Sequence, residues 1–460
     1  MRHEKVVIVG AGPAGIRAAV VLAEHGLKPV VIDEAPASGG QIFRRQPQGF
    51  TRTHAELYGF ESKRARALHD AFDALGSRID HVANALVWNV GERQLQVLRD
   101  SGNETIGFDR LLLATGAMDR VIPFPGWTTP GVYTLGGAQV ALKHQACAIG
   151  QRVVFFGSSP LLPLVALQYA VAGVEVAGVL DTTPRDVKIA AIPGLLAGGA
   201  TGLKGLTYLA RLALRGIRYR HGITPVEALG DGSVTGFAYI DAGGRRHEVA
   251  CDAIAFGYGL KSEWQLADLA GCRFAFDADT HQWRVEADAD GRSSVEHVYL
   301  AGDGARIAGA EVAADTGERA ARAILADMGD SGQGAALSAI SRRLARQVGL
   351  RRAIDRAFRF PAHLARTVPD DCILCRCEAV RAGEFRAAIE TLAPDDVNRA
   401  KAFSRVGMGR CQGRVCGSAA AEILAAALGC PTAEAGRLRS QPPVKPVPVA
   451  AFAGREGDAA

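Results

Sequence analysis

The chain has 460 residues, of which 48% are hydrophobic and 22% charged, and its formal net charge is +5. This length predicts two to four domains with ordinary buried cores, and nine cysteines are too few for a disulfide scaffold. Lys and Arg are spread along the chain without a basic block, which argues against a nucleic-acid partner. The N-terminus lacks the apolar segment of a signal peptide, so we expect a cytoplasmic protein with reduced thiols.

The chain opens with a predicted βαβ unit. Residues 6–9 (VVIV) are an apolar run typical of a buried parallel strand, and residues 14–25 suit a helix. A second apolar strand follows within residues 28–34 (KPVVIDE). A strand, a glycine-rich turn, a helix and a second strand in this order predict a nucleotide-binding unit.

Three glycines between the first strand and the helix match the pattern G-x-G-x-x-G. Gly10 permits the tight turn, Gly12 lets the backbone approach a pyrophosphate, and Gly15 allows close packing of helix and strand. Asp33 lies where an acidic residue binds ribose hydroxyls, and Glu34 is adjacent. The sequence does not choose between these two carboxylates.

Three later motifs resemble those of flavin enzymes of the glutathione-reductase type and occur in the same order. They are GGQI (39–42), LLATG (112–116) and VYLAGDG (298–304). The resemblance implies FAD as the cofactor, with the carboxylate of the Gly-Asp turn near the ribityl and pyrophosphate groups. The residues expected to bind FAD are therefore Gly10, Gly12, Ala14, Gly15, Asp33, Glu34, Gly40, Gln41, Ala114, Thr115, Gly116, Gly302 and Asp303.

A second, damaged βαβ unit is predicted over residues 150–181. Gly157 is retained, but Ser159 and Leu162 stand where the second and third glycines of the motif belong. Asp181 ends the next strand and could still bind a ribose. Either this unit binds a dinucleotide weakly, or it keeps the fold and has lost the ability to bind NAD(P)H. We favour the second interpretation.

Residues 153–174 form a charge-free run of 22 residues, which is long enough to cross a bilayer. The run contains a Gly-Ser-Ser-Pro break and a second proline, Pro163. We therefore predict a strand, a tight turn and a buried helix here, and no membrane span.

Four cysteines in the C-terminal region have the spacing C-x-C-x33-C-x4-C. They are Cys375, Cys377, Cys411 and Cys416. Four thiolates are the ligand set of a 2Fe-2S cluster. Zinc remains an alternative, although zinc modules usually use knuckles of two to four intervening residues. Cys372 lies outside the pattern but could substitute for Cys375.

The sequences around these cysteines suit an anionic cluster. Residues 378–392 and 417–428 look helical, so each cysteine pair is expected at a helix N-terminus, where free N–H groups stabilise negative charge. Arg376, Arg410 and Arg414 would offset the charge of the thiolates. The segment resembles the 2Fe-2S domain of the bacterioferritin-associated-ferredoxin type.

The motifs together resemble the larger flavin subunit of heteromeric amino-acid dehydrogenases, a group that includes opine oxidase, D-hydroxyproline dehydrogenase and, more remotely, hydrogen cyanide synthase. The quoted motifs are GAGPAGIRAA, DEAPASGGQIFRR, GWTTPGVYTLGGAQ, LAGDGARIAGAE and CRCE with GMGRCQGRVCG. The resemblance implies a smaller flavin-dependent oxidase-type subunit that oxidises a C–N bond, and often a small ferredoxin-like subunit.

The expected function is therefore electron transfer within such a complex, with FAD and a 2Fe-2S cluster as carriers and without NAD(P)H. Two alternatives stay open: a self-contained NAD(P)H-dependent FAD and 2Fe-2S reductase, and a non-enzymatic redox or iron sensor. No acid–base pair or C-x-x-C dithiol stands out, so no catalytic residue is assigned.

The predicted fold is α/β, with two Rossmann-like three-layer domains of the glutathione-reductase type and a small, mainly helical C-terminal domain. Its segments are 1–121 with 251–330 (FAD-binding domain), 122–250 (degenerate NAD(P)-binding-like domain), 331–370 (connector), 371–440 (2Fe-2S domain) and 441–460 (extended tail).

Overall fold

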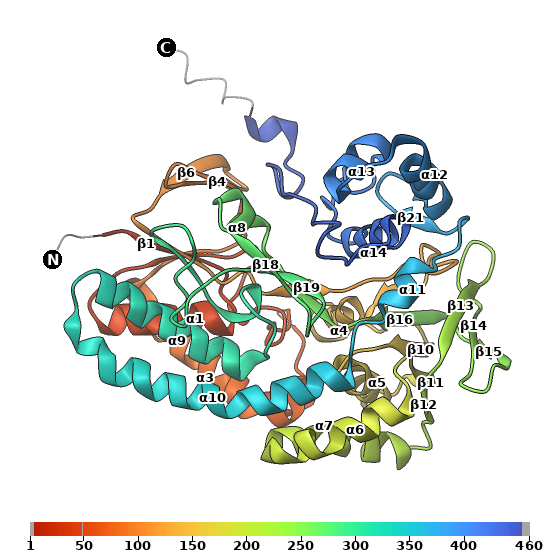
Figure 1. Cartoon of the computed structure of the whole chain (residues 1–460). Helices are drawn as coiled ribbons and strands as arrows, with labels where there is room; N and C mark the ends of the chain where they lie inside the picture. The colour runs from red at the N-terminus through yellow and green to blue at the C-terminus, as the bar shows by residue number, and fades with distance from the viewer. Residues whose placement is uncertain (1–3, 48, 453–460) are drawn as a thin grey trace.

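The computed structural model describes residues 4–47 and 49–452 (Figure 1). Its first domain is built on a five-stranded parallel sheet. Four of the strands are short apolar or nearly apolar runs, as expected for a sheet covered on both faces, whereas the edge strand Asp80–Val82 is polar and mostly exposed. The strand order is β20 (Val298–Leu300), β7 (Arg110–Leu113), β1 (Val6–Val9), β2 (Val30–Ile32) and β3 (Asp80–Val82).

Helices cover one face of this sheet and an antiparallel sheet covers the other. The helices are α1 (Pro13–Glu24), α3 (Ser62–Asp73) and α9 (Ala310–Asp327). On the opposite face, Val7 and Val9 share a buried cluster with Val87 and Leu95 of the small sheet. That sheet consists of β4 (Leu86–Gly91), β5 (Gln94–Arg99) and β6 (Gly102–Gly107), which completes three layers.

The second domain repeats this plan. Its parallel sheet has the order β12 (Tyr219–His221), β11 (Glu175–Asp181), β10 (Arg152–Gly157), β16 (Ala253–Gly257) and β9 (Val132–Thr134). Helices α4 (Leu135–Lys143), α5 (Leu161–Val171) and α7 (Gly199–Ala213) pack around one apolar cluster with it. The other layer is the antiparallel sheet β13 (Thr224–Leu229), β14 (Gly236–Ile240) and β15 (Arg246–Ala250). The predicted pair of Rossmann-like domains is confirmed.

The charge-free run 153–174 folds as β10, a tight turn and α5, which is the predicted arrangement. No helix in the described ranges is long and apolar enough to cross a membrane.

The C-terminal region is reached through two helices, α10 (Gly334–Ala357) and α11 (Ala362–Arg366). It contains a short hairpin and three helices, which lie together at the upper right of Figure 1. They are β21 (Ile373–Cys375), β22 (Val380–Arg381), α12 (Ala382–Leu392), α13 (Val397–Ser404) and α14 (Gly417–Leu428). Their apolar core is continuous with the second domain, because one buried cluster extends from Phe156 through Phe360 to Cys375 and Leu424. The remaining elements are α2 (His54–Tyr58), α6 (Arg185–Ala197), α8 (Gln265–Leu269), β8 (Ala117–Asp119), β17 (Leu260–Ser262), β18 (Phe274–Asp277) and β19 (Gln282–Val285).

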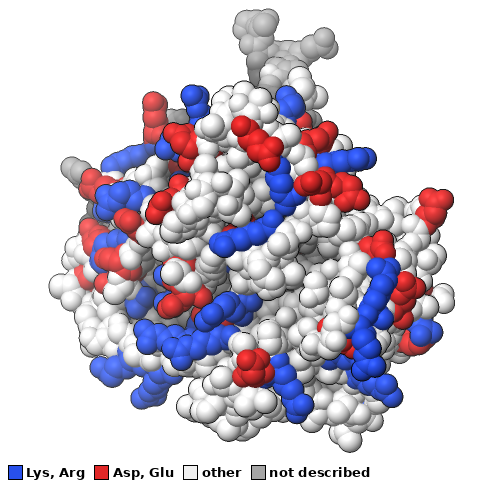
Figure 2. Space-filling view, turned by 45° about the vertical axis from the view of Figure 1, so that its right-hand side comes forward, with Lys and Arg blue, Asp and Glu red and all other residues white. Residues whose placement is uncertain are grey.

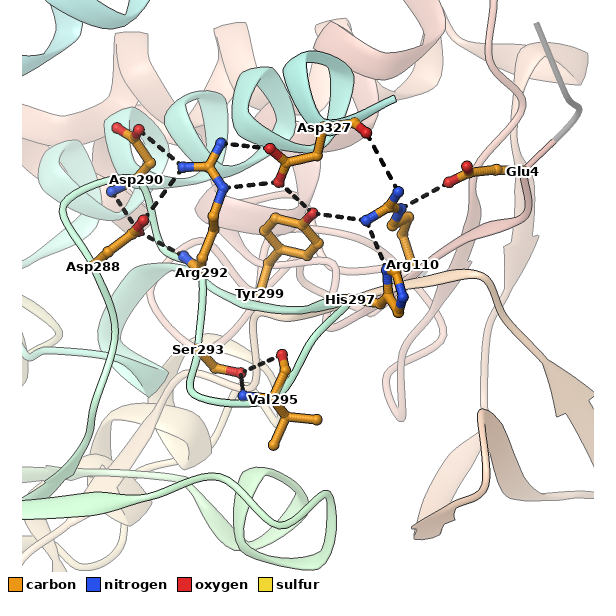
Figure 3. Close-up of polar contacts among 10 residues, drawn as sticks. All are labelled: Glu4, Arg110, Asp288, Asp290, Arg292, Ser293, Val295, His297, Tyr299 and Asp327. Carbon is orange, nitrogen blue, oxygen red and sulfur yellow. Dashed lines mark hydrogen bonds and ion pairs between the residues drawn. The ribbon is translucent and has the colours of Figure 1, made fainter. Parts of the chain in front are cut away.

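A polar network fastens the outer strand of the first sheet to the end of α9 (Figure 3). The guanidinium of Arg292 donates two hydrogen bonds of 2.8 Å to the carboxylate of Asp327, and the Tyr299 hydroxyl donates a third of 2.6 Å. On the neighbouring strand, Arg110 donates to Glu4 at 2.7 Å and to the Tyr299 hydroxyl at 3.3 Å. The network lies away from the carboxyl ends of the strands, where the glycine turns are. Its role is therefore to stabilise the sheet.

Candidate functional site

The first glycine turn is shaped so that only glycine fits at two of its positions. Gly10 has a φ of +106°, and a Cβ there would lie 2.3 Å from the carbonyl oxygen of Ala114. A Cβ on Gly15 would lie 1.8 Å from the carbonyl oxygen of Gly10. Gly12 precedes α1 and faces the backbone of Gly40. Because neither glycine has a side chain, the backbones of the two loops form an open cradle at the N-terminus of the helix. This geometry suits a pyrophosphate.

The two acidic residues after β2 have different surroundings. The carboxylate of Asp33 accepts hydrogen bonds from the Ala11 amide at 2.5 Å and the Ala35 amide at 2.7 Å, so it ties the glycine turn to the end of β2. Glu34 instead pairs with Lys445 from the tail and is 53% exposed. Both residues line the same cavity, with Asp33 at the inner position next to the glycine turn.

The opposite wall comes from the ends of β7 and β20. The Thr115 hydroxyl donates to the carbonyl oxygen of Glu263 at 2.5 Å, which joins this edge to the β17–α8 segment. A Cβ on Gly302 (φ +67°) would lie 2.9 Å from the Cβ of Ala14 on α1. The Asp303 carboxylate accepts hydrogen bonds from the amides of Ala308 and Gly309, yet burial raises its pKa.

These walls enclose one cavity of about 910 Å³, within the size range of cofactor sites. Twelve of the thirteen residues expected to bind FAD line it, and Gly15 lies behind the cradle against Gly10. The carboxyl ends of β1, β2, β7 and β20 all meet at this cavity, which is where open parallel sheets place their ligands. Their sequence motifs are far apart in the chain, but the fold brings them together.

The second βαβ unit has a closed turn. Ser159 is 1% exposed and its Oγ accepts a hydrogen bond from the Leu161 amide at 3.2 Å, so its side chain fills the place of the missing glycine. Leu162 is fully buried in the domain core. Asp181 is also fully buried, where it accepts hydrogen bonds from the Tyr219 hydroxyl at 2.6 Å and the Thr183 amide at 2.8 Å.

The segment between α10 and α11 lies over this closed turn. The Ser158 hydroxyl donates to the carbonyl oxygen of Arg359 at 3.2 Å, and the Lys188 ammonium lies 3.3 Å from the centre of the Phe358 ring. Phe360 is 7% exposed, and the guanidinium of Arg120 lies over its ring, 3.3 Å from the ring centre. The chain itself therefore occupies part of the face on which a second dinucleotide would lie, while Ser159, Pro160 and Leu161 line the edge of the large cavity described above.

The four cysteines of the spaced motif lie in two adjoining loops. Cys375 ends β21 and Cys416 precedes α14, and each is 1% exposed, whereas Cys377 and Cys411 are partly buried. Cys416 is at a helix N-terminus, as predicted. The prediction was wrong for the other pair, because residues 378–381 form a turn and strand β22, and α12 begins only at Ala382. The antiparallel pairing with β21 overrides the local helical preference of residues 378–381.

The thiols contact each other in pairs. A hydrogen bond with the Cys416 thiol lowers the pKa of Cys375 to about 6, with help from the backbone amides of Gly407, Glu378 and Cys377. Cys377 and Cys411 are likewise within hydrogen-bonding contact. A Cβ on Gly409 would lie 2.3 Å from the Cβ of Cys377, so the loop passes very close to that thiol. No group of three or more His, Cys, Asp or Glu side chains in the described residues is arranged to hold a metal ion.

Cys372 stands apart from these pairs. It is 3% exposed, its Sγ lies 3.7 Å from the carbonyl oxygen of Ile373, and burial raises its pKa to about 12. A buried thiol of this kind is inert, so the site is defined by the other four.

An ion pair connects the cysteine loop to the wall of the cavity. Arg414, which follows Cys411, donates to the two carboxylate oxygens of Glu263 at 2.7 and 3.2 Å, and also reaches the carbonyl oxygen of Cys411 at 3.5 Å. Glu263 is the residue whose carbonyl oxygen binds Thr115. Glu263 and Arg414 thus form a direct path of contacts from the LLATG motif to the cysteine loop, and the Gln265 side chain adds a second contact by donating to the carbonyl oxygen of Gln412 at 3.0 Å.

Sequence reasoning missed several cationic residues that line the cavity. The sequence pattern assigns Arg414 to the thiolate charge, but its main partner is Glu263. The missed residues are Arg44, Arg120, Arg351, Arg359 and Lys445. Arg44 lies within the quoted motif DEAPASGGQIFRR, but the other four are on segments far apart in the chain and carry no motif, so no sequence signal identifies them.

The fold and this cavity define a class of protein: a two-domain dinucleotide-binding oxidoreductase. Residues 4–317 match the family of pyridine nucleotide-disulphide oxidoreductases, and residues 380–455 match the sarcosine oxidase A3 domain. Among solved structures, L-proline dehydrogenase from P. horikoshii superposes with a TM-score of 0.71 at 20% identity, covering 98% of this chain and 79% of that one. That likeness shows the same fold.

Two relatives are similar over nearly their whole lengths. The A subunit of opine oxidase from Rhizobium meliloti (strain 1021) is 34% identical, covering 96% of each chain. The HcnB subunit of hydrogen cyanide synthase from Pseudomonas aeruginosa is 35% identical, covering 97% of each. The chain belongs to the pyridine nucleotide-disulphide oxidoreductase family, in the group of these two subunits. The resemblance noted in the sequence is confirmed.

Proposed function

We propose that this protein is the electron-transferring flavoprotein subunit of a heteromeric dehydrogenase. The complex oxidises the C–N bond of an amino acid, an imino acid or an opine. Its near full-length relatives are named as subunits of opine oxidase and of hydrogen cyanide synthase, which supports a multisubunit enzyme. We infer that a smaller flavin-dependent oxidase-type subunit binds the substrate, and that a small ferredoxin-like subunit joins the complex in some members of the group.

FAD fits the cavity of the first domain. The bare backbone of Gly10 and Gly12 would receive the pyrophosphate, and Asp33 or Glu34 the ribose. Ala14, Gly40, Gln41, Ala114, Thr115, Gly116, Gly302 and Asp303 would line the rest. When bound, FAD accepts electrons in pairs and releases them singly. The residues of this chain orient it and exclude water from it.

We infer that the four cysteines would hold a 2Fe-2S cluster, although their two thiol pairs are not arranged around a single metal ion in the described residues. Cys375, Cys377, Cys411 and Cys416 supply four sulfur ligands, and the low pKa of Cys375 favours a thiolate. Close-packed glycine loops leave backbone amides near the sulfurs. All nine cysteines are unpaired, which supports a reducing, cytoplasmic location.

One observation carries the proposal. The edge of the FAD cavity and the cysteine loop are joined through Thr115, Glu263 and Arg414. Such a rigid connection would hold two carriers at a fixed separation, which electron transfer requires. The domain limits predicted from the sequence, with residues 331–370 as a connector and 371–440 as the cluster domain, belong to the same proposal.

The source of electrons is the partner subunit, not NAD(P)H. The closed turn at Ser159 and the segment from Phe358 to Phe360 leave no bare cradle in the described part of the second domain. One of the two alternatives, a self-contained NAD(P)H-dependent reductase, would need this face of the second domain to be open to a dinucleotide.

The test is co-expression with the neighbouring genes and anaerobic purification of the complex. Flavin reduction is then followed by the loss of its visible absorption with a panel of amino acids, imino acids and opines, with NADH and NADPH as contrast. We expect bleaching by one class of C–N substrate and no bleaching by pyridine nucleotide. Rapid bleaching of the isolated chain by NADH, or zinc without acid-labile sulfide, would overturn the proposal.

A further inference from the structure

One extended segment lies between the large cavity and the cysteine loop. It runs from β17 to the first residue of α8, over residues 260–265. Leu260 lines the large cavity, and the Ser262 hydroxyl donates to the carbonyl oxygen of Asp303 at 2.6 Å. Because successive side chains of a strand point to opposite faces, Lys261 points away from that cavity.

The side chains that alternate with these are directed at the cysteine loop. Glu263 accepts hydrogen bonds from Arg414, and Gln265 donates one to the carbonyl oxygen of Gln412. Both partners belong to the loop between the second pair of cysteines. Lys261 precedes Glu263 by two positions, so its side chain lies on the same side of the segment.

A small cavity separates Lys261 from the cysteine loop. Its volume is about 80 Å³, and Gly413 and Gly417 are among the other residues that line it. Gly417 is the first residue of α14 and follows Cys416 directly. The hydrogen bond with Cys375 and burial raise the pKa of Cys416, whereas the positive charge of Lys261 acts to lower it. The Lys261 ammonium is therefore close enough to this thiol to act on its charge.

Lys261 has no carboxylate partner of its own. On the outer face shown in Figure 2, many Lys and Arg side chains lie against Asp or Glu side chains. In the part of the chain that the structure describes, no hydrogen bond or salt bridge reaches the Lys261 ammonium. Glu263 pairs with Arg414, and Glu422, which also lines the small cavity, pairs with His281.

The charge of Lys261 is retained in this position. Burial lowers its pKa to about 8, against the attraction of Glu263 and Cys416, so the ammonium stays charged at about pH 7. Lys401 of α13 is 8% exposed, and Cys416 likewise opposes the lowering of its pKa by burial. A cation held away from water needs a compensating anion, and cysteines ionised as metal ligands supply one.

We propose that Lys261 raises the reduction potential of the 2Fe-2S cluster held by the four cysteines, and so favours electron flow from FAD to the cluster. The role assigned to Lys261 rests on the proposed function. A cluster ligated by four thiolates carries net negative charge, and its reduction adds an electron, so a positive charge beside Cys416 stabilises the reduced form. Lys261 acts through its charge and contacts no substrate, so it is a positioning residue.

The transfer itself makes and breaks no bond. In each step one electron leaves the reduced flavin and converts one ferric ion of the cluster to ferrous, while Lys261 keeps its proton. A one-electron acceptor of the ferredoxin class removes the first electron before the second leaves the flavin, and the proton of the flavin passes to water.

The test is an anaerobic redox titration of the co-purified complex, in which electron paramagnetic resonance follows the reduced cluster. Lys261→Met should lower the equilibrium constant for cluster reduction at least about tenfold, which is a fall in potential of about 59 mV or more for a one-electron couple. Lys261→Arg keeps the positive charge and should restore the constant to within about threefold.

The chain offers a matched control in Lys143 at the end of α4. Lys143 is buried, burial lowers its pKa to about 8 as well, and its Nζ lies 3.5 Å from the carbonyl oxygen of Ile42. It belongs to the second domain and lines neither of the two cavities. Lys143→Met should therefore leave the cluster potential unchanged.

Iron and acid-labile sulfide, measured in every preparation, separate the possible failures. If Lys261→Met loses the cluster, Lys261→Gln, which keeps a polar end in the small cavity, replaces it. A full cluster with an unchanged potential would overturn the role of Lys261 and leave the proposed function intact. An equal shift in Lys143→Met, or a shift that Lys261→Arg does not reverse, would also overturn that role. Absence of iron and sulfide from the unaltered complex would overturn the proposed function itself.

Discussion

Replacing Arg414 with Met should loosen the attachment of the C-terminal domain to the FAD cavity. The side chains of Arg414 and Glu263 are only 11% and 19% exposed, and they are joined by hydrogen bonds of 2.7 and 3.2 Å. Met keeps the apolar stem but removes the charge, so the Glu263 carboxylate stays in a mostly buried position without its partner.

The size of the effect follows from this burial. Removing one partner of a buried ion pair costs about 3–5 kcal/mol, and because Glu263 keeps some contact with water we expect about 3 kcal/mol. That free energy corresponds to a roughly 100-fold larger population of the opened state, since about 1.4 kcal/mol is a factor of ten. Arg405 is the control: it pairs with Glu378 at 2.8 Å but is 66% exposed, so Arg405→Met should cost less than about 1 kcal/mol.

Hydrogen exchange of the amides of α14, followed by mass spectrometry, measures this opening directly. Exchange in the Arg414→Met protein should accelerate by about 100-fold, and in the Arg405→Met protein by less than about fivefold. If both variants exchange alike, the ion pair does not hold the domain and the connection argued from it fails.

Three further changes test the rest of the site and the fold. Gly10→Ala places a Cβ against the carbonyl oxygen of Ala114 at a positive φ, so bound flavin, read from the visible absorption spectrum, should fall at least about tenfold; full occupancy would contradict the assigned cradle. Cys411→Ser should lower iron and acid-labile sulfide by about tenfold or more, whereas Cys372→Ser should leave both unchanged, and the reverse pattern would exchange their roles. Burial alone would raise the pKa of Asp327, but hydrogen bonds from Arg292 and Tyr299 outweigh it and hold the pKa below its ordinary value. The stabilisation by Asp327 is therefore present above about pH 4 and is lost as the pH falls through the lowered pKa. Asp327→Asn should lower the free energy of unfolding by roughly 1–3 kcal/mol at about pH 7, and by much less near about pH 3. Urea unfolding at both pH values measures this, and a cost that does not change with pH would refute it.

The glycine turn and the acid after β2 could be predicted from the sequence because their constraint is local. A Cβ at Gly10 would lie 2.3 Å from the carbonyl oxygen of Ala114, which excludes every side chain there and leaves a readable pattern. The buried strands β1, β2, β10 and β11 were equally predictable, because buried parallel strands are continuous apolar runs, whereas the polar edge strands β3 and β12 show no such run.

The covering of the second domain and the pairing of Arg414 with Glu263 could not be predicted. The two features depend on contacts between residues that lie 201 and 151 positions apart, respectively. In addition, a sequence does not distinguish an Arg that is exposed from one that forms an ion pair. The strand β22 was missed for a related reason, since its pairing with β21 is a tertiary choice that outweighs helix propensity in a short segment.

The tail bears on how the protein is made. Val444 is buried among the residues of the first domain, its amide donates to the carbonyl oxygen of Trp88 at 3.1 Å, and Lys445 next to it pairs with Glu34. Part of one wall of the nucleotide cavity is thus encoded close to the end of the described chain. Because Lys445 lies 411 positions after Glu34, the ribosome must release all of the intervening chain before that wall can close, so tight retention of the cofactor should follow the synthesis of the second domain and the cysteine region.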